Sequence, residues 1–169
     1  MKRKRLGSDI YNLSTWKKTL VEIEDGLERK IPPLLLIVLI QNGVLESVLQ
    51  VLVRNEIEVI ILGQKNSGSV LYRKICVRNK LDGLVIMHAK SKIKTNNIPI
   101  MLLDRIVEGK KGIGSLIDTL RIETFRHIKK IGFDRRQRAV YRIYDIYIRK
   151  QPAITIKEYF LIDLPLWNS

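Results

Sequence analysis

The sequence predicts an α+β fold in which one antiparallel sheet of about six strands is covered by a few helices. Segments rich in Ile, Val and Tyr recur along the chain and are separated by turn residues, which is typical of strands. Two of these turns are too short to hold a crossover helix, so the strands that they join must be antiparallel. Only short stretches repeat apolar residues at helical spacing.

The 169 residues fit a single domain, because a chain of this size rarely supports two hydrophobic cores. We expect residues 1–30 to form a polar N-terminal arm and residues 31–169 to form one continuous domain. Pro32 and Pro33 mark the entry to this domain. No internal repeat or low-complexity linker interrupts it.

The domain opens with an apolar segment, residues 34–40, which lies between two prolines and the turn pair Asn42-Gly43. Its short length and branched side chains favour a buried strand. The next segment, residues 44–53, is predicted to be a helix because its apolar residues recur at helical spacing, at Val44, Leu45, Val48, Leu49 and Leu52.

Further strands are predicted over residues 57–62, 70–77, 84–93, 140–148 and 154–162. The pairs Asp82-Gly83 and Gln151-Pro152 separate neighbouring strands and indicate antiparallel hairpins. Residues 114–120 are predicted to form one short helix, with Leu116, Ile117 and Leu120 on one side.

The net charge of +14, from 31 basic and 17 acidic residues, raises the question of a nucleic-acid partner. That interpretation needs a clustered face, whereas the basic residues are spread along the chain. The abundance of Ile, Lys and Asn is better explained by the coding bias of an AT-rich genome, and an anionic substrate is compatible with that bias. We therefore expect no nucleic-acid partner.

Several kinds of site are not expected. The lone Cys76 cannot form an intramolecular disulfide, and with His88 and His127 it gives no spacing typical of a metal site. Neither a metal nor an organic cofactor is therefore predicted. The longest apolar run, residues 34–40, is too short to span a membrane. The glycine-rich residues 109–114 lack the Gly-Lys-Ser/Thr ending of a nucleotide-binding loop.

Two charged residues interrupt the apolar faces of predicted strands. Arg73 shares a face with Leu71, Ile75 and Val77, and Glu158 shares one with Ile154, Ile156, Phe160 and Ile162. A buried charge needs a partner or a charged ligand. Arg73 and Glu158 either pair with each other or sit at sheet edges facing water, or they form an internal site for a small acid that carries a hydroxyl group.

At these residues the sequence resembles the chorismate lyase family, in particular its cyanobacterial branch and the related plastid open reading frames of red algae. The similarity runs over residues 34–165. Its matching stretches are LIQNGVLESVL (39–49), LYRKICV (71–77), AKSKI (89–93), GIGSLIDTLRIETFRHIKKIG (112–132) and ITIKEYF (154–160). The resemblance implies a chorismate lyase-like fold, with helices around a closed internal pocket.

The resemblance also implies roles for particular residues. Arg73 matches the arginine that holds a substrate carboxylate, and Glu158 matches the essential acid near the ring hydroxyl. Ile113 falls where the family binds the ring carboxylate through a backbone N–H, and Leu45 is expected to line the pocket. Lys90 replaces an arginine that helps to close the pocket, which keeps the charge but loses the bidentate fork.

The chain departs from the family in one turn. One residue in a matching stretch also has two possible roles. Val44 and Glu46 stand where many members carry Ser and Thr in an early turn. Arg126 either adds positive charge near the site or braces the fold.

The activity implied is the conversion of chorismate to 4-hydroxybenzoate and pyruvate, without a cofactor. We expect the protein to be a monomer. We expect it in the plastid stroma, or in the cytoplasm if the chain is cyanobacterial. One alternative is a sensing domain for aromatic acids, because effector domains of some transcription regulators resemble this fold; residues 1–30 are too few for the DNA-binding domain that normally precedes them. The other is a small basic RNA-binding protein, which only the charge favours.

Overall fold

The computed structural model describes residues 13–168. Three helices come first, α1 (Leu13–Leu27), α2 (Pro33–Ile40) and α3 (Leu45–Val53), and three strands follow, β1 (Ile57–Ser67), β2 (Val70–Asn79) and β3 (Val85–Lys94). The chain continues through α4 (Ile100–Glu108) and α5 (Ile113–Thr119) to β4 (Thr124–Asp134), β5 (Ala139–Ile148) and β6 (Gln151–Leu161). Short 3-10 helices lie at Thr95–Asn97 and Pro165–Asn168.

The six strands form one sheet in the order β1-β2-β3-β6-β5-β4, and every neighbouring pair is antiparallel. The predicted α+β fold is thus confirmed, and so are the two hairpins. Gly83 turns the chain between β2 and β3 with a φ of 72°. The turn between β5 and β6 lies at Arg149 and Lys150, which also have positive φ, so Gln151 and Pro152 already belong to β6.

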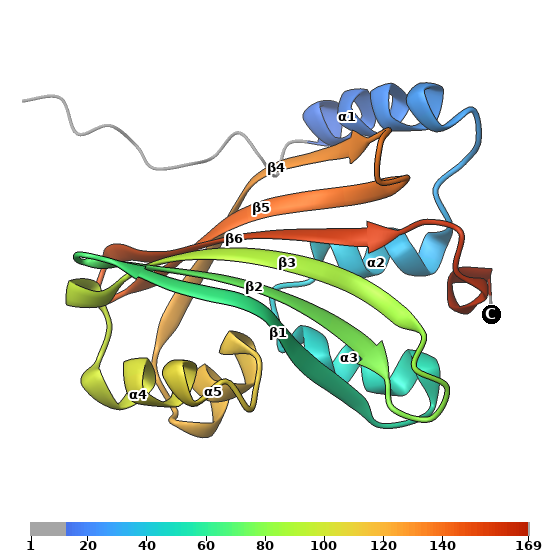
Figure 1. Ribbon diagram of the computed structural model, residues 1–169. Coiled ribbons are helices and arrows are strands. Elements are labelled where there is room, and N and C mark those ends of the chain that lie inside the picture. The colour runs from blue at the N-terminus through green and yellow to red at the C-terminus, as the bar shows by residue number, and fades with distance from the viewer. Residues whose placement is uncertain (1–12, 169) are drawn as a thin grey trace, which may run out of the picture.

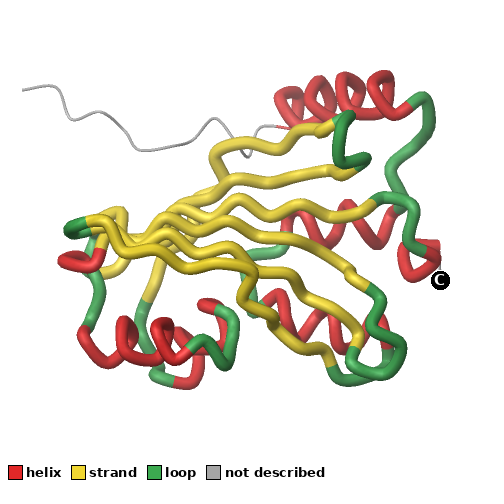
Figure 2. The backbone as a smooth tube through the Cα atoms, in the orientation of Figure 1, coloured by secondary structure: helices red, strands yellow, loops and turns green. Residues whose placement is uncertain are grey.

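Helices α2, α3, α4 and α5 lie on one side of the sheet, and α1 packs alongside the edge strand β4 (Figures 1 and 2). The core fills the space between the helices and the facing side of the sheet. The largest fully buried side chains include two arginines, together with Trp167 and Phe160. No helix among the described residues is long and apolar enough to cross a membrane.

The prediction that residues 34–40 form a strand is wrong, because they form helix α2. An apolar run of this length fits either structure by pattern alone. Pro33 occupies the start of the helix, where a proline needs no hydrogen-bonded N–H and has a favourable φ. Leu35, Val38 and Leu39 are buried, whereas Ile37 and Ile40 are about half exposed.

Three elements were not predicted from the sequence. Strand β4 carries several basic side chains, and a bulge between Ile128 and Lys130 shifts its register, so its apolar residues do not alternate regularly. Helix α4 is also additional. Residues 1–30, predicted to be a polar arm, include helix α1, while residues 1–12 lie outside the described part of the chain.

Candidate functional site

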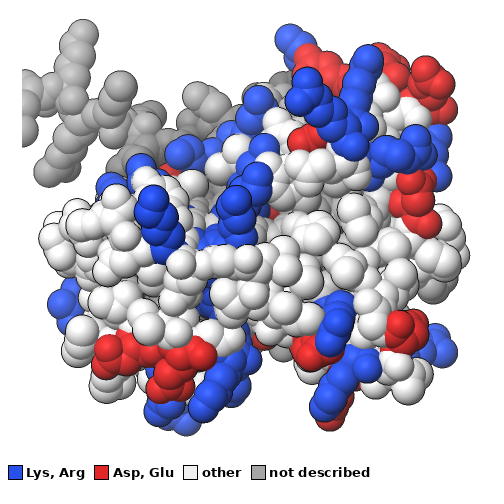
Figure 3. Space-filling model, in the orientation of Figure 1, with Lys and Arg blue, Asp and Glu red and all other residues white. Residues whose placement is uncertain are grey.

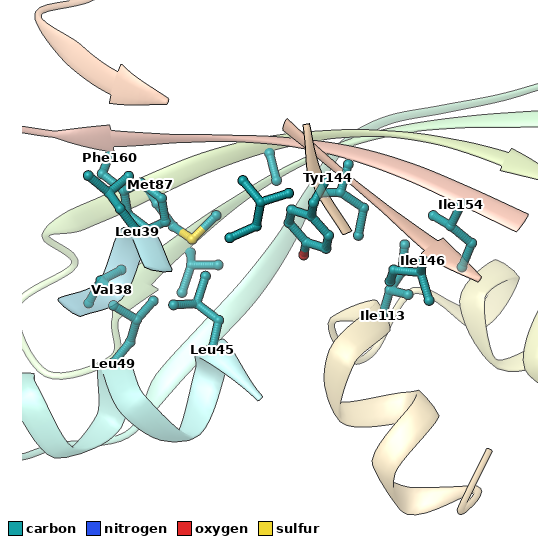
Figure 4. Close-up of a cluster of buried hydrophobic side chains, with 14 of the residues drawn as sticks. Val38, Leu39, Leu45, Leu49, Met87, Ile113, Tyr144, Ile146, Ile154 and Phe160 are labelled. Carbon is teal, nitrogen blue, oxygen red and sulfur yellow. The ribbon is translucent and has the colours of Figure 1, made fainter. Parts of the chain in front are cut away.

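A small cavity lies inside the fold, between the sheet and helices α3 and α5. Its volume is about 50 Å³, and it is lined by residues of four strands, β2, β3, β5 and β6, of helix α3, and of the loop before α5 with the start of that helix. In Figure 4, Leu45 and Leu49 lie on one side of the central gap and Ile113 on the other, with Tyr144 pointing between them. Charged groups converge here, since the lining residues include Arg73, Glu158 and Glu46.

Strand β2 places Arg73 in this cavity. The side chain is only 2% exposed, as the alternation of apolar neighbours predicts. Its Nη2 donates a hydrogen bond to the Lys111 carbonyl at 2.9 Å, but Nε and Nη1 have no partner among the described residues. Burial lowers the pKa of Arg73, and the charge of Glu46 opposes that shift. The free edge of the guanidinium is thus available to an anionic ligand.

Strand β6 places Glu158 in the same cavity, where it is 5% exposed. One carboxylate oxygen accepts a hydrogen bond from Nε of Arg142 at 2.6 Å, and the other accepts one from the Tyr144 hydroxyl at 2.8 Å. The partner of Glu158 is therefore Arg142 and not Arg73. Neither β2 nor β6 is an edge strand, so both of the simpler interpretations of Arg73 and Glu158 are excluded.

Arg142 and Tyr144, both on β5, were missed in the sequence. Arg142 is 2% exposed, and its Nη1 donates to the carbonyls of Val38 and Gln41, each at 2.8 Å, at the end of α2. Burial alone would lower the pKa of Arg142, but Glu158 raises it above its usual value. Burial, together with the nearby charge of Glu158, holds the pKa of Tyr144 well above its usual value. The phenol therefore stays protonated and donates to the carboxylate.

The glycine-containing loop before α5 forms one wall of the cavity. Gly112 is the N-cap of α5, and Ile113 is the first residue of the helix. A Cβ on Gly112 would overlap the carboxylate of Glu46, so the missing side chain leaves room for that carboxylate next to the loop. Glu46 comes from the first turn of α3. Helix α3 and the loop before α5 thus meet beside the cavity, which both of them line.

The structure brings together four of the five residues that the sequence analysis assigned to the site. Leu45 and Ile113 are 9% and 5% exposed and line the cavity beside Arg73 and Glu158. Lys90 does not join them. Its neighbours Ala89 and Ser91 face the cavity, and Lys90 is exposed, with its ammonium 5.5 Å from the centre of the Tyr159 ring.

Arg126 braces the segment before α3. From β4 it donates hydrogen bonds to the carbonyls of Asn42 and Gly43. It does not line the internal cavity, although an added Cβ on Gly114 would lie 3.6 Å from its guanidinium.

A larger groove lies elsewhere, against β4 and β5, with a volume of about 840 Å³. Phe125, His127 and Tyr147 line it, and its lining includes none of the buried charges. We regard the small cavity as the candidate site because Arg73 and Glu158 line it, and buried ionic groups need a partner or a charged ligand. No cluster of metal-binding side chains occurs among residues 13–168.

Comparisons with known proteins find relatives over most of the chain. The chain is 28% identical to the chorismate pyruvate-lyase of Mycobacterium leprae, over 79% of this chain and 76% of that protein. It is 26% identical to the chorismate pyruvate-lyase of Mycobacterium tuberculosis, over 82% of this chain and 85% of that protein. The chain is similar to chorismate pyruvate-lyases over most of its length.

No family model matches the chain. Among solved structures, PhnF of Mycobacterium smegmatis shares the fold, with a TM-score of 0.52 at 11% sequence identity. The match covers 72% of this chain and 64% of PhnF. At this identity the likeness concerns the fold alone.

Proposed function

We propose that the protein is a chorismate lyase, which converts chorismate to 4-hydroxybenzoate and pyruvate. The observation that carries this proposal is the buried Arg73, whose guanidinium has two nitrogen atoms without a partner among residues 13–168, inside a cavity that Glu158 also lines. Chorismate carries two carboxylates and a ring hydroxyl. It therefore offers an anion to the arginine and a donor to the carboxylate.

In the proposed reaction, the ether bond between the ring and the enolpyruvyl oxygen breaks, and the ring loses a proton as it becomes aromatic. The three-carbon fragment takes up a proton and leaves as pyruvate. Arg73 anchors a substrate carboxylate and stabilises the charge on the departing fragment. Glu158 orients the ring hydroxyl or assists proton movement, and Tyr144 and Arg142 hold its two oxygens.

No cofactor or metal takes part in this proposal. The backbone at Ile113 binds the ring carboxylate and Leu45 contacts the ring, since both residues line the cavity. Lys90 has no part in it, because its side chain lies on the other side of β3. We further propose that the protein acts as a monomer, in the plastid stroma, or in the cytoplasm if the chain is cyanobacterial.

The cavity must open before it can take a substrate. Its volume of about 50 Å³ is well below the roughly 300 Å³ of small ligand sites. Helix α3 and the loop before α5 meet over it through Glu46 and Gly112. We propose that these two segments separate to admit chorismate and close again before the chemistry.

The test is to incubate the purified protein with chorismate and to quantify 4-hydroxybenzoate and pyruvate by chromatography. We expect equimolar products, and a loss of kcat/KM of at least about a hundredfold in Arg73→Ala. The matched control is Arg105→Ala, which removes an exposed arginine that pairs with Glu108. Nearly full activity in Arg73→Ala would overturn the role of Arg73. An absence of turnover with tight 4-hydroxybenzoate binding would instead favour a sensing domain.

A further inference from the structure

One face of the sheet carries no covering helix over strands β2, β3 and β6 (Figures 1 and 2). Side chains on this face alternate with those that line the internal cavity. The strand register brings six of them together, and we call this group the open face: Lys65, Tyr72, Lys74, Lys90, Lys92 and Lys157.

Lysines of the open face lie directly opposite one another. Lys74 is the register partner of Lys90, and Lys90 is the partner of Lys157. Neighbouring strands are about 4.8 Å apart, and like charges in directly opposite positions destabilise a sheet. None of the open-face lysines forms an ion pair with a described acidic residue. The arrangement therefore costs stability unless an anion neutralises it.

The next acidic side chain on this face does not supply that anion. Asp145 is 8% exposed and is already engaged by Lys129 at 3.2 Å and by the Thr155 hydroxyl at 2.6 Å. In Figure 3, basic side chains lie over the middle of the sheet, while most acidic ones lie toward the margins of the molecule. The lysines are distant in the sequence, which is why they look scattered there and cluster only in the fold.

An exposed aromatic ring lies among these charges. Tyr72 is 44% exposed, and its register partners are Lys65 on one side and Lys92 on the other. Two other tyrosines on this face are already covered, because the ammonium of Lys157 lies 4.0 Å from the ring centre of Tyr141 and 4.6 Å from that of Tyr159. Of these three tyrosines, Tyr72 is therefore the one whose ring is open to a partner.

We propose that the open face binds single-stranded nucleic acid. An exposed ring flanked by cations on an uncovered sheet matches what a single strand offers, because its bases are free to stack and its phosphates can meet the ammonium groups. The bases of a duplex are stacked on one another inside the helix, so they cannot stack on Tyr72. An acidic protein or an anionic membrane surface would use the lysines but not Tyr72.

The experiment measures the binding of a fluorescent 12-nucleotide oligouridylate by anisotropy at several salt concentrations. In Tyr72→Ala the affinity should fall about tenfold, because stacking on one base is lost, whereas Tyr72→Phe should bind like the wild type. In Lys74→Gln/Lys92→Gln the slope of log K against log salt should become shallower by about 1.4, roughly 0.7 for each phosphate contact.

The matched control is Lys17→Gln/Lys18→Gln, which removes the same charge from the exposed side of α1 beside β4, the far edge of the sheet. Equal weakening in both double variants would show binding by net charge and would overturn the site. The site would also be overturned if a duplex bound with the same affinity as the single strand and Tyr72→Ala did not change the binding. Binding to phosphatidylserine vesicles that depends on Lys74 and Lys92, without RNA binding, would reassign the face to a membrane.

Discussion

Glu46 places a second negative charge in a cavity that is proposed to bind an anion. Its carboxylate packs against Gly112, and its charge acts on Arg73. An incoming carboxylate would have to displace Glu46 or share Arg73 with it. The side chain thus stands where a ligand anion is needed, and it competes with that ligand.

We predict that Glu46→Gln tightens the binding of 4-hydroxybenzoate roughly fivefold, because the repulsion is removed while the size of the side chain is kept. Titration calorimetry at neutral pH measures this change. Glu108→Gln, an equal loss of charge on an exposed helix residue, should leave the affinity unchanged. Weaker binding in Glu46→Gln would mean that the carboxylate organises the site.

The burial of Arg73 and Glu158 could be predicted from strand alternation. The residue that pairs with Glu158 could not be predicted in this way. Arg73 and Glu158 each interrupt an apolar face in the sequence, and both are buried as that pattern requires. Arg142 interrupts the face of Val140, Tyr144 and Ile146 in the same way, so a signal for it was present. That Glu158 pairs with Arg142 depends on β5 and β6 being neighbours in register, which a single sequence does not specify.

At the scale of the element, Arg142 joins helix α2 to the sheet. One nitrogen of its guanidinium holds the carbonyls at the end of the helix, and another holds Glu158. A cation at a helix C-terminus also interacts favourably with the helix dipole. This contact explains how a run of apolar residues is stable as a helix here, although its composition equally suits a strand.

We predict that Arg142→Met destabilises the fold by about 3–5 kcal/mol, because Glu158 is left buried without its cation. The double variant Arg142→Met/Glu158→Gln should recover part of that loss, since the uncompensated charge is gone. Urea unfolding followed by circular dichroism gives the free energies of unfolding. A cost below about 1 kcal/mol for Arg142→Met would show that the ion pair contributes as little as an exposed one.

At the scale of the whole molecule, Asp163 connects three distant segments. It accepts hydrogen bonds from Arg29, before α2, and from Arg138, in the turn between β4 and β5, at 3.1 and 2.9 Å. The hydrogen bond from Arg138 holds the pKa of Asp163 below its usual value. The carboxylate therefore stabilises the fold where it is charged and stops doing so as it becomes protonated.

We predict that Asp163→Asn lowers Tm by about 1–3 °C at pH 7. The difference from the wild type should persist down to about pH 3.9, the usual pKa of an aspartate, and should vanish as the pH falls further through the lowered pKa of Asp163. Thermal melts over this pH range measure it. A difference that stayed constant at low pH would show that packing, and not charge, is responsible.

The strand order divides the sheet into two meanders, β1-β2-β3 and β4-β5-β6, and only β3 and β6 join them. Within each meander, neighbouring strands are close in the sequence. The pairing of β3 with β6, in contrast, joins residues far apart in the sequence, such as Ala89 and Glu158. Arg73 comes from the first meander, while Glu158, Arg142 and Tyr144 come from the second. Because local contacts form before distant ones, neither half of the nascent chain holds a binding site. We therefore expect the site to be complete only after the two meanders have paired through β3 and β6.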